Sequence, residues 1–161
     1  MKAFKIQQTF FSFAHNYKLF SHPNEQEIGI ARGKVFKIRS SYAVSRSDGS
    51  FWFKIQRNLW KTKYTIKDEQ GRYLGHYRTP MFAILKKKLS LVKDNIEYPT
   101  KGSFWGLNFE IFSQDNKQLM SVNKKFFKIR DSFLVEYLDD FDPRLAISAA
   151  IVADDRYHPN K

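Results

Sequence analysis

Basic side chains alternate with apolar ones in a phrase that this chain contains twice. Residues 34–44 read KVFKIRSSYAV, and residues 125–135 read KFFKIRDSFLV. Lysine and arginine bind anionic groups through charge-assisted hydrogen bonds, and the planar guanidinium of arginine can hold two oxygens at once. The chemistry that these residue types suggest is therefore the binding of phosphate or carboxylate groups.

The alternation predicts how these bases are presented. A period of two is typical of a β-strand with one buried face, here followed by a turn and a second strand. Successive side chains of a strand point to opposite faces. We therefore expect Phe36 and Ile38 to face a core, and Lys37 and Arg39 to face solvent. In the second copy, Lys128 matches Lys37 and Arg130 matches Arg39, so the same outward positions are expected for them.

Two fainter copies of the phrase, at residues 57–64 and 87–96, extend the set of candidate bases. The candidates share a place on an outward strand position or at a strand end. An alternative reading stays open, because outward strand positions must be polar and lysine also protects sheet edges from aggregation. The candidate anion-binding or lipid-binding residues are Lys34, Lys37, Arg39, Lys86, Lys87, Lys88, Lys124, Lys125, Lys128 and Arg130.

The duplication also bears on architecture. Internal similarity indicates one supersecondary unit used more than once, so we expect the copies to occupy equivalent places in one fold. The spacing between copies varies, which excludes a solenoid of fixed period and favours a sheet built of repeated hairpins.

Composition limits the class of protein. A chain of 161 residues is the size of one domain, which we place at 1–161. A hydrophobic fraction of 42% with 17% aromatic residues excludes general disorder and favours strands. The absence of cysteine excludes disulfides and thiolate metal sites. The first residues alternate without a long apolar run, and no stretch has the length of a membrane span. We expect a cytoplasmic, soluble protein, at most peripheral at the inner membrane surface.

The charge is distributed unevenly along the chain. The formal net charge is +12, and residues 31–130 carry 22 basic against 7 acidic side chains, a balance of +15. A basic surface of this size attracts anionic lipid headgroups, nucleic acid or phosphorylated ligands. The alternative is a solvated face that only keeps the protein soluble.

Turn-forming residues recur every eight to fifteen positions or so, at 22–24, 47–49, 68–71, 98–102 and 115–117. Between them, strand-like runs occupy residues 4–10, 51–56, 64–67, 73–76, 107–112, 118–122 and 133–137. With the duplicated units, about a dozen strands are expected. Short strands at this density predict a mainly β fold, an antiparallel sandwich or barrel.

One segment predicts a helix instead. Asp142 followed by Pro143 is a strong helix start, and residues 145–153 are almost uniformly small and apolar. A helix that is apolar all round should be buried on every side. We expect a helix over about 143–154 in the lumen of a closed sheet. Asp154 and Asp155 are disfavoured by the helix dipole and are expected to mark its exit into solvent.

These segments resemble the LURP-one-related family. The resemblance rests on KKFFKIRDSFLV at 124–135, the acidic pair at 139–140, the helix at 145–153, YTIKDEQG at 64–71 and KKKL at 86–89. It implies the fold of the tubby C-terminal domain and phospholipid scramblases, a closed antiparallel barrel of about twelve strands around a central C-terminal helix. Tubby domains bind phosphoinositides, but no lipid-binding motif of theirs aligns here, so no residue role is carried over.

The sequence gives less support for catalysis or metal binding than for the binding of anions. The four histidines are scattered, the acids near Asp142 are explained by helix capping, and no phosphate loop or nucleophile motif is present. We expect no enzyme, cofactor or metal. Trp60 and Trp105 are expected to close the barrel ends or, alternatively, to anchor at a lipid interface or stack on a base. The leading hypothesis is a binding module for anionic phospholipid headgroups or phosphorylated ligands. A scaffold for an acidic protein partner is the alternative, and nucleic acid is disfavoured.

Overall fold

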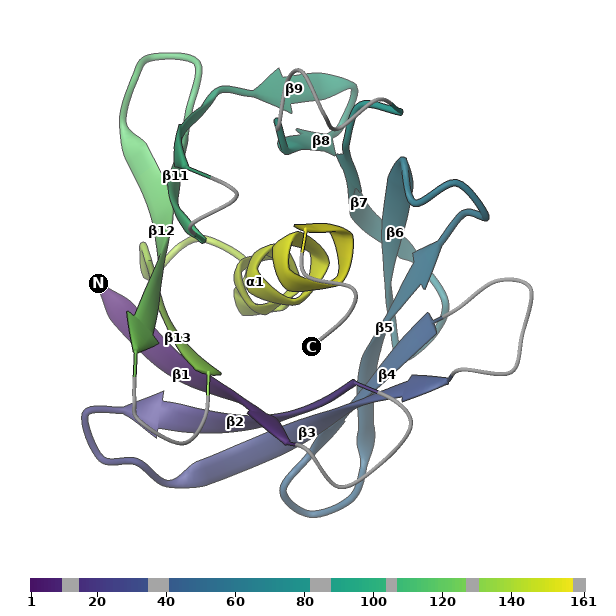
Figure 1. Ribbon diagram of the computed structural model, residues 1–161, viewed down its shortest axis with the longest axis vertical. Helices are drawn as coiled ribbons and strands as arrows, with labels where there is room; N and C mark the ends of the chain where they lie inside the picture. The colour runs from purple at the N-terminus through teal and green to yellow at the C-terminus, as the bar shows by residue number, and fades with distance from the viewer. Residues whose placement is uncertain (10–14, 35–40, 82–87, 104–106, 127–130, 158–161) are drawn as a thin grey trace.

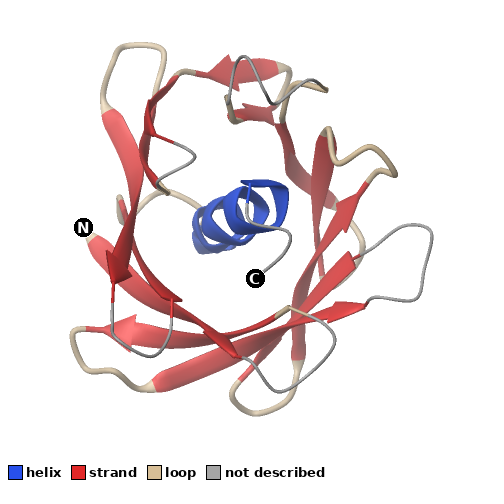
Figure 2. Ribbon diagram, viewed as in Figure 1, coloured by secondary structure: helices blue, strands red, loops and turns tan. Residues whose placement is uncertain are grey.

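The computed structural model describes residues 1–9, 15–34, 41–81, 88–103, 107–126 and 131–157. Strands form a ring around one helix (Figure 1), and the helix α1 (Pro143–Tyr157) lies inside this ring rather than on its outer surface (Figure 2). The predicted mainly β barrel with a central C-terminal helix is therefore confirmed.

The sheet has thirteen strands. Every strand run predicted from the sequence overlaps one of them. In chain order they are β1 (Lys2–Thr9), β2 (Asn16–His22), β3 (Glu27–Lys34), β4 (Ser41–Arg46), β5 (Phe51–Arg57), β6 (Lys63–Asp68), β7 (Tyr73–Arg78), β8 (Ser90–Lys93), β9 (Ile96–Tyr98), β10 (Thr100–Ser103), β11 (Asn108–Phe112), β12 (Gln118–Phe126) and β13 (Asp131–Tyr137).

The sheet closes through the chain itself. The strand order runs from β10 through β13, then β1 through β9, so β9 and β10 are its two edges. Only Pro99 separates them in sequence. The prediction of a turn at 98–102 is therefore wrong, because the chain continues as a strand and changes partner at Pro99. A proline has no N–H to donate to a ladder, so an edge position suits it. Counted as one bent segment, β9 and β10 give the expected dozen strands.

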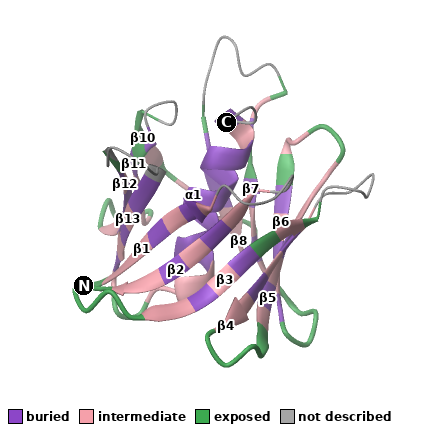
Figure 3. Cartoon of the chain, turned by 60° about the horizontal axis from the view of Figure 1, so that its bottom comes forward, coloured by how far each residue is buried: buried purple, intermediate pink, exposed green. Residues whose placement is uncertain are grey.

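Alternation along the strands builds the core. In β5, Phe53 and Ile55 are fully buried while Lys54 between them is partly exposed, and in β6 the buried apolar residues are Tyr64 and Ile66. The inward side chains pack around the helix, which is buried along its length (Figure 3). Burial of this apolar surface is the main stabilising contribution to such a fold.

The helix starts where the sequence predicts. The backbone N–H of Arg144 donates to Asp142 Oδ1 at 2.9 Å, which makes Asp142 the N-cap. All residues from 145 to 155 are buried, so the expectation of burial on every side is confirmed. The helix continues to Tyr157, three residues beyond the predicted end.

The two copies of the duplicated phrase occupy equivalent places, as far as they are described. Lys34 pairs with Ser41 at the β3–β4 connection, and the matching residues Lys125 and Ser132 pair at the β12–β13 connection. The aromatic residues at matching distances, Tyr42 and Phe133, are both buried on the inner face. The central residues of both copies, 35–40 and 127–130, lie outside the described residues.

Candidate functional site

The helix and half of the strands end on the same side of the barrel. Neighbouring strands are antiparallel throughout, so β3, β5, β7 and β12 run in one direction. Near the end of α1, Arg156 donates to Thr79 Oγ1 at 3.1 Å and to the Pro80 carbonyl at 3.0 Å, just beyond the end of β7. We call this side of the barrel the helix-exit end; α1 rises toward it in Figure 3.

Asp155 is the centre of a buried polar cluster at the helix-exit end. Its carboxylate accepts hydrogen bonds from the hydroxyls of Tyr42 at 2.7 Å and Tyr64 at 2.8 Å. The Arg57 guanidinium donates to both carboxylate oxygens, at 2.8 and 3.1 Å. These partners are inward-facing residues of β4, β6 and β5, so the cluster fastens the end of the helix to three adjacent strands.

The neighbouring Asp154 is bound in the same way. Its Oδ2 accepts a hydrogen bond from the Tyr17 hydroxyl at 2.8 Å, and both Asp154 and Asp155 are buried. The expectation that these acids mark an exit into solvent is therefore wrong. The helix dipole disfavours carboxylates at a C-terminus, but here inward tyrosines and Arg57 supply the compensating donors.

The cluster sets the ionisation of its members. Burial by itself would raise the pKa of Asp155, but the charges of Arg57 and Lys61 and the two tyrosine hydrogen bonds outweigh it and hold the pKa below its ordinary value. Burial, together with the Asp155 charge, raises the pKa of Tyr42 and Tyr64 well above the ordinary value for tyrosine. Asp155 is therefore a carboxylate at neutral pH, and both tyrosines are neutral donors.

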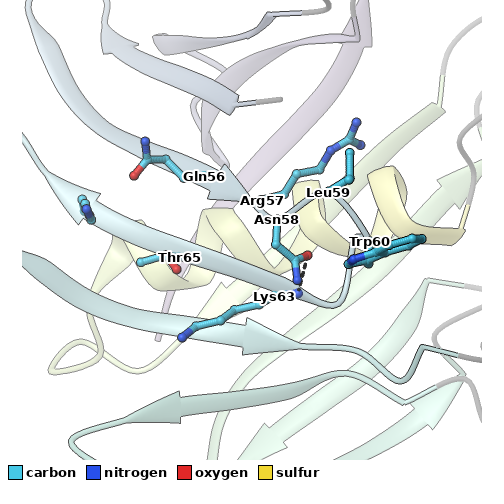
Figure 4. Close-up of a pocket in the computed structure, with 8 residues that line it drawn as sticks. Gln56, Arg57, Asn58, Leu59, Trp60, Lys63 and Thr65 are labelled. Carbon is cyan, nitrogen blue, oxygen red and sulfur yellow. Dashed lines mark hydrogen bonds between the residues drawn. The ribbon is translucent and has the colours of Figure 1, made fainter. Parts of the chain in front are cut away.

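The turn after Arg57 leads from this cluster to the outer surface. Asn58 Oδ1 accepts from the backbone N–H groups of Thr62 at 2.8 Å and Lys63 at 3.1 Å, and Asn58 Nδ2 donates to Thr62 Oγ1 at 2.7 Å. The close-up in Figure 4 shows Asn58 turned back toward Lys63, with Trp60 at the tip of the turn. The turn presents Leu59 and Trp60 to solvent, 61% and 68% exposed.

A second set of contacts fixes the same turn from the β7 side. Thr79 Oγ1 donates to the Lys61 carbonyl at 2.6 Å, and the Thr79 N–H donates to the Thr62 carbonyl at 2.9 Å. Lys61 has a φ of +53°, and its ammonium donates to the Asp155 carbonyl at 3.4 Å. The turn is therefore bonded to β7 and to the helix as well as to itself.

The outer surface beside this turn is hollowed by two adjoining grooves. The first, which we call the Trp60 groove, has a volume of about 380 Å³ (Figure 4). The second, the β7–β8 groove, has a volume of about 530 Å³ and shares Asn58 and Lys63 with the first. The Trp60 groove is lined by Gln56, Arg57, Asn58, Leu59, Trp60, Lys63, Thr65 and Lys67. The β7–β8 groove is lined by Asn58, Thr62, Lys63, Arg78, Thr79, Pro80, Lys88, Ser90 and Glu97.

Like charges face each other across the strands that carry these grooves. Lys54 lies opposite Lys67, and Lys63 lies opposite Arg78. Like charges in directly opposite positions destabilise a sheet. Arg78 forms an ion pair with Glu97 at 2.8 Å, but no carboxylate in the described part of the chain pairs with Lys54, Lys63 or Lys67. This surface can lower its electrostatic free energy by taking up an anion.

Only some of the basic residues predicted from the sequence as an anion site lie at or near this grooved surface. Lys34 and Lys125 are exposed at the helix-exit end, and Lys88 is exposed and lines the β7–β8 groove. Lys124 is only 8% exposed and shares the inward alternation of Met120 and Val122, so the prediction that it serves an outer face is wrong. The other candidates, Lys37, Arg39, Lys86, Lys87, Lys128 and Arg130, lie outside the described residues.

Several bases of this surface were missed. Lys54 and Lys67 lie at outward positions of predicted strands, and the period-two alternation of those strands was sufficient to find them. Lys63 and Arg78 lie just outside the predicted runs 64–67 and 73–76, at positions where the structure extends β6 and β7. The expectation that Trp60 closes a barrel end is wrong, because its side chain is exposed on the turn. Trp105 lies outside the described residues.

In the ranges that the structure describes, no cluster of side chains suggests metal binding. No group of three or more histidine and acidic side chains is placed to hold a metal ion there. His15 is hydrogen bonded to Gln8 at 2.8 Å and His76 to Tyr73 at 2.6 Å. No helix in these ranges is long and apolar enough to cross a membrane.

Comparison with known proteins agrees with this architecture. The X-ray structure of a protein from Arabidopsis thaliana has a similar fold, with a TM-score of 0.66 over 96% of this chain and 91% of that chain. The two sequences are 12% identical, so the likeness extends to the fold alone. No curated protein matches this chain in sequence.

The fold and the site define a class of protein: an antiparallel barrel around a buried helix, with a basic, grooved outer surface. The sequence profile of the LURP-one-related family matches residues 2–154, and the chain belongs to that family. The resemblance noted from the sequence is therefore confirmed. Neither this family nor this barrel fold is known for enzymatic activity.

Proposed function

We propose that this protein is a non-enzymatic binding module whose basic outer face at the Trp60 groove and the β7–β8 groove binds phosphate-bearing anions. The ligand is an anionic phospholipid headgroup or a phosphorylated ligand, which share the same phosphate chemistry. The observation that carries the proposal is the opposition of Lys54 to Lys67 and of Lys63 to Arg78 on the grooved surface.

Three features of the grooves support this proposal. The ammonium groups of Lys63 and Lys67 line the Trp60 groove, pair with no carboxylate of the described residues, and offer charge-assisted hydrogen bonds to phosphate oxygens. Thr65 and Gln56 lie on the outward face between these bases and add neutral hydrogen-bonding groups. The turn at Asn58 is fixed by its own hydrogen bonds, so binding does not require this border of the groove to become ordered.

The first test reverses two of the groove charges. We expect the double variant Lys63→Glu/Lys67→Glu to bind vesicles of phosphatidylcholine and phosphatidylserine at least about 30-fold more weakly than the unmodified protein. A base near an anionic surface contributes about 1 kcal/mol, and two such losses correspond to about 30-fold. Sedimentation with vesicles measures this affinity, and vesicles of phosphatidylcholine alone are the neutral reference.

The matched control carries the same change of charge at the other end of the barrel. Lys2→Glu/Lys117→Glu also lowers the formal net charge from +12 to +8, since each substitution changes the charge by −2, and both lysines are exposed. Equal losses in the two variants would show that only net charge matters. Absence of binding to both the anionic vesicles and a soluble phosphoserine peptide would overturn the proposed function and leave an acidic protein partner as the explanation of the basic face.

A further inference from the structure

We propose that the helix-exit end docks on an anionic membrane with the side chains of Leu59, Trp60 and Met81 inserted among the lipid headgroups. We call these three residues the apolar tip. The inference rests on the proposed function and deepens it, because it assigns the phosphate to a bilayer surface rather than to a soluble molecule. It also assigns an orientation to the barrel.

The apolar tip is unusual for its exposure and its continuity. Leu59 and Trp60 are adjacent in sequence, and Met81, 60% exposed, follows the Thr79 segment that is hydrogen bonded to the same turn. The other exposed large hydrophobic residues in the described ranges precede or begin strands β1, β5, β7 and β9, which start at the opposite end of the barrel. They are Met1, Phe51, Tyr73 and Ile96.

The tip is held in place before anything binds. Asn58 fixes the turn that carries Leu59 and Trp60, and Thr79 joins that turn to the segment that carries Met81. The Arg156 guanidinium donates to the backbone carbonyl of Pro80 at 3.0 Å and to that of Met81 at 3.4 Å. Ordering costs that would oppose insertion are therefore already met by the fold.

Charge complementarity identifies the occupant. Lys63 and Lys88 line the grooves beside the tip, and exposed Lys34 and Lys125 lie at the same end of the barrel. Tryptophan is enriched at the membrane–water interface, where its ring lies at headgroup depth. Basic side chains around an inserted apolar residue meet the phosphate layer of an anionic leaflet. An apolar tip with bases beside it therefore fits a bilayer surface.

Insertion is tested by the fluorescence of Trp60. In the variant Trp52→Phe/Trp105→Phe, Trp60 is the only tryptophan left, since the chain has three. We expect its emission to shift to shorter wavelength on phosphatidylcholine–phosphatidylserine vesicles and to be quenched when the acyl chains are brominated. Binding by sedimentation without any quenching would overturn the inference.

A pair of matched variants tests the energetic role of the tip. Trp60→Ala is expected to weaken binding to the anionic vesicles by about tenfold or more, because it removes a large apolar contact. Phe51→Ala makes a comparable truncation at the opposite end and is expected to leave the affinity unchanged. Leu59→Ser provides a second variant, and thermal unfolding shows that each of them is folded. Equal affinities for Trp60→Ala, Leu59→Ser and the unmodified protein would contradict tip insertion.

The outcomes separate the two proposals. If the charge-reversed Lys63→Glu/Lys67→Glu variant loses vesicle binding while Trp60 is never quenched, the basic face binds phosphate and the tip stays in water. If the protein binds phosphoserine peptide but no vesicle, the proposed function survives and the membrane inference fails. If it binds neither, both fail.

Discussion

Replacement of Asp155 by asparagine is expected to lower the free energy of unfolding by about 3 to 5 kcal/mol, the cost of removing one partner of a buried ion pair. Asparagine has nearly the same shape, but it removes the negative charge that compensates Arg57. It also replaces an oxygen that accepts from tyrosine or from Arg57 by an NH₂ donor, which cannot accept either bond. The partly buried guanidinium of Arg57 then loses the carboxylate to which it donates two hydrogen bonds.

Urea denaturation followed by tryptophan fluorescence measures the effect. Asp139→Asn is the matched control, because it makes the same chemical change at an exposed carboxylate whose pairing with the N-terminal amine is long, at 3.6 Å. We expect this control to leave the denaturation midpoint nearly unchanged. A loss of stability in Asp155→Asn no larger than in the control would show that the cluster contributes nothing beyond packing.

The same carboxylate predicts a pH dependence. Its pKa in the folded protein is lowered, so folding favours the ionised form. The resulting stabilisation is fully present above the pKa of the unfolded chain, about 3.9 for aspartate, and is lost as the pH falls through the lower folded-state value. The gap in stability between the unmodified protein and Asp155→Asn should therefore stay constant from neutral pH down to about pH 4 and narrow below it. A gap that widens on acidification would contradict this assignment.

The fold was accessible to sequence reasoning because its determinants are local and repeated. Alternation of side chains predicts the strands, and Asp142 followed by Pro143 predicts where the helix starts. The small apolar body of the helix indicates that it is buried on all sides. The duplicated phrase predicts equivalent places for its two copies, and Tyr42 and Phe133, at matching distances in the copies, are both buried on the inner face.

The site depended on relations that a single sequence does not display. Asp154 and Asp155 read as the polar end of a helix, because their partners Tyr17, Tyr42 and Arg57 are about 100 or more residues away in sequence. Strand β12 runs to Phe126, so Lys124, which the sequence places at the end of a repeated unit, lies within the strand and in its inward phase. The opposition of Lys54 to Lys67 requires the register of two strands, which the hydrophobic pattern alone does not specify.

The second large effect is expected at Ile151, in the middle of the helix. Its side chain is fully buried, and the helix that carries it lies inside the ring of strands (Figure 2). Ile151→Ala is expected to destabilise the protein by about 2 to 5 kcal/mol, because it removes buried methyl groups and leaves a cavity that a closed barrel cannot easily collapse around. An open sheet could move its layers together, whereas here every strand except the edges β9 and β10 is paired with neighbours on both sides.

Urea denaturation measures the free energy of unfolding of Ile151→Ala and of Ile96→Ala. The difference between the two losses gives the cost of the cavity, because both variants make the same chemical change. Ile96 begins β9 and is exposed, so its truncation removes a similar volume without creating a void, and only a small change is expected. A loss near the upper limit at Ile151 would mean that the barrel is too rigid to contract around the helix. A loss close to that of Ile96→Ala would instead mean that the ring of strands adjusts its diameter, and that the helix is a loosely fitted plug rather than the element on which the barrel is built.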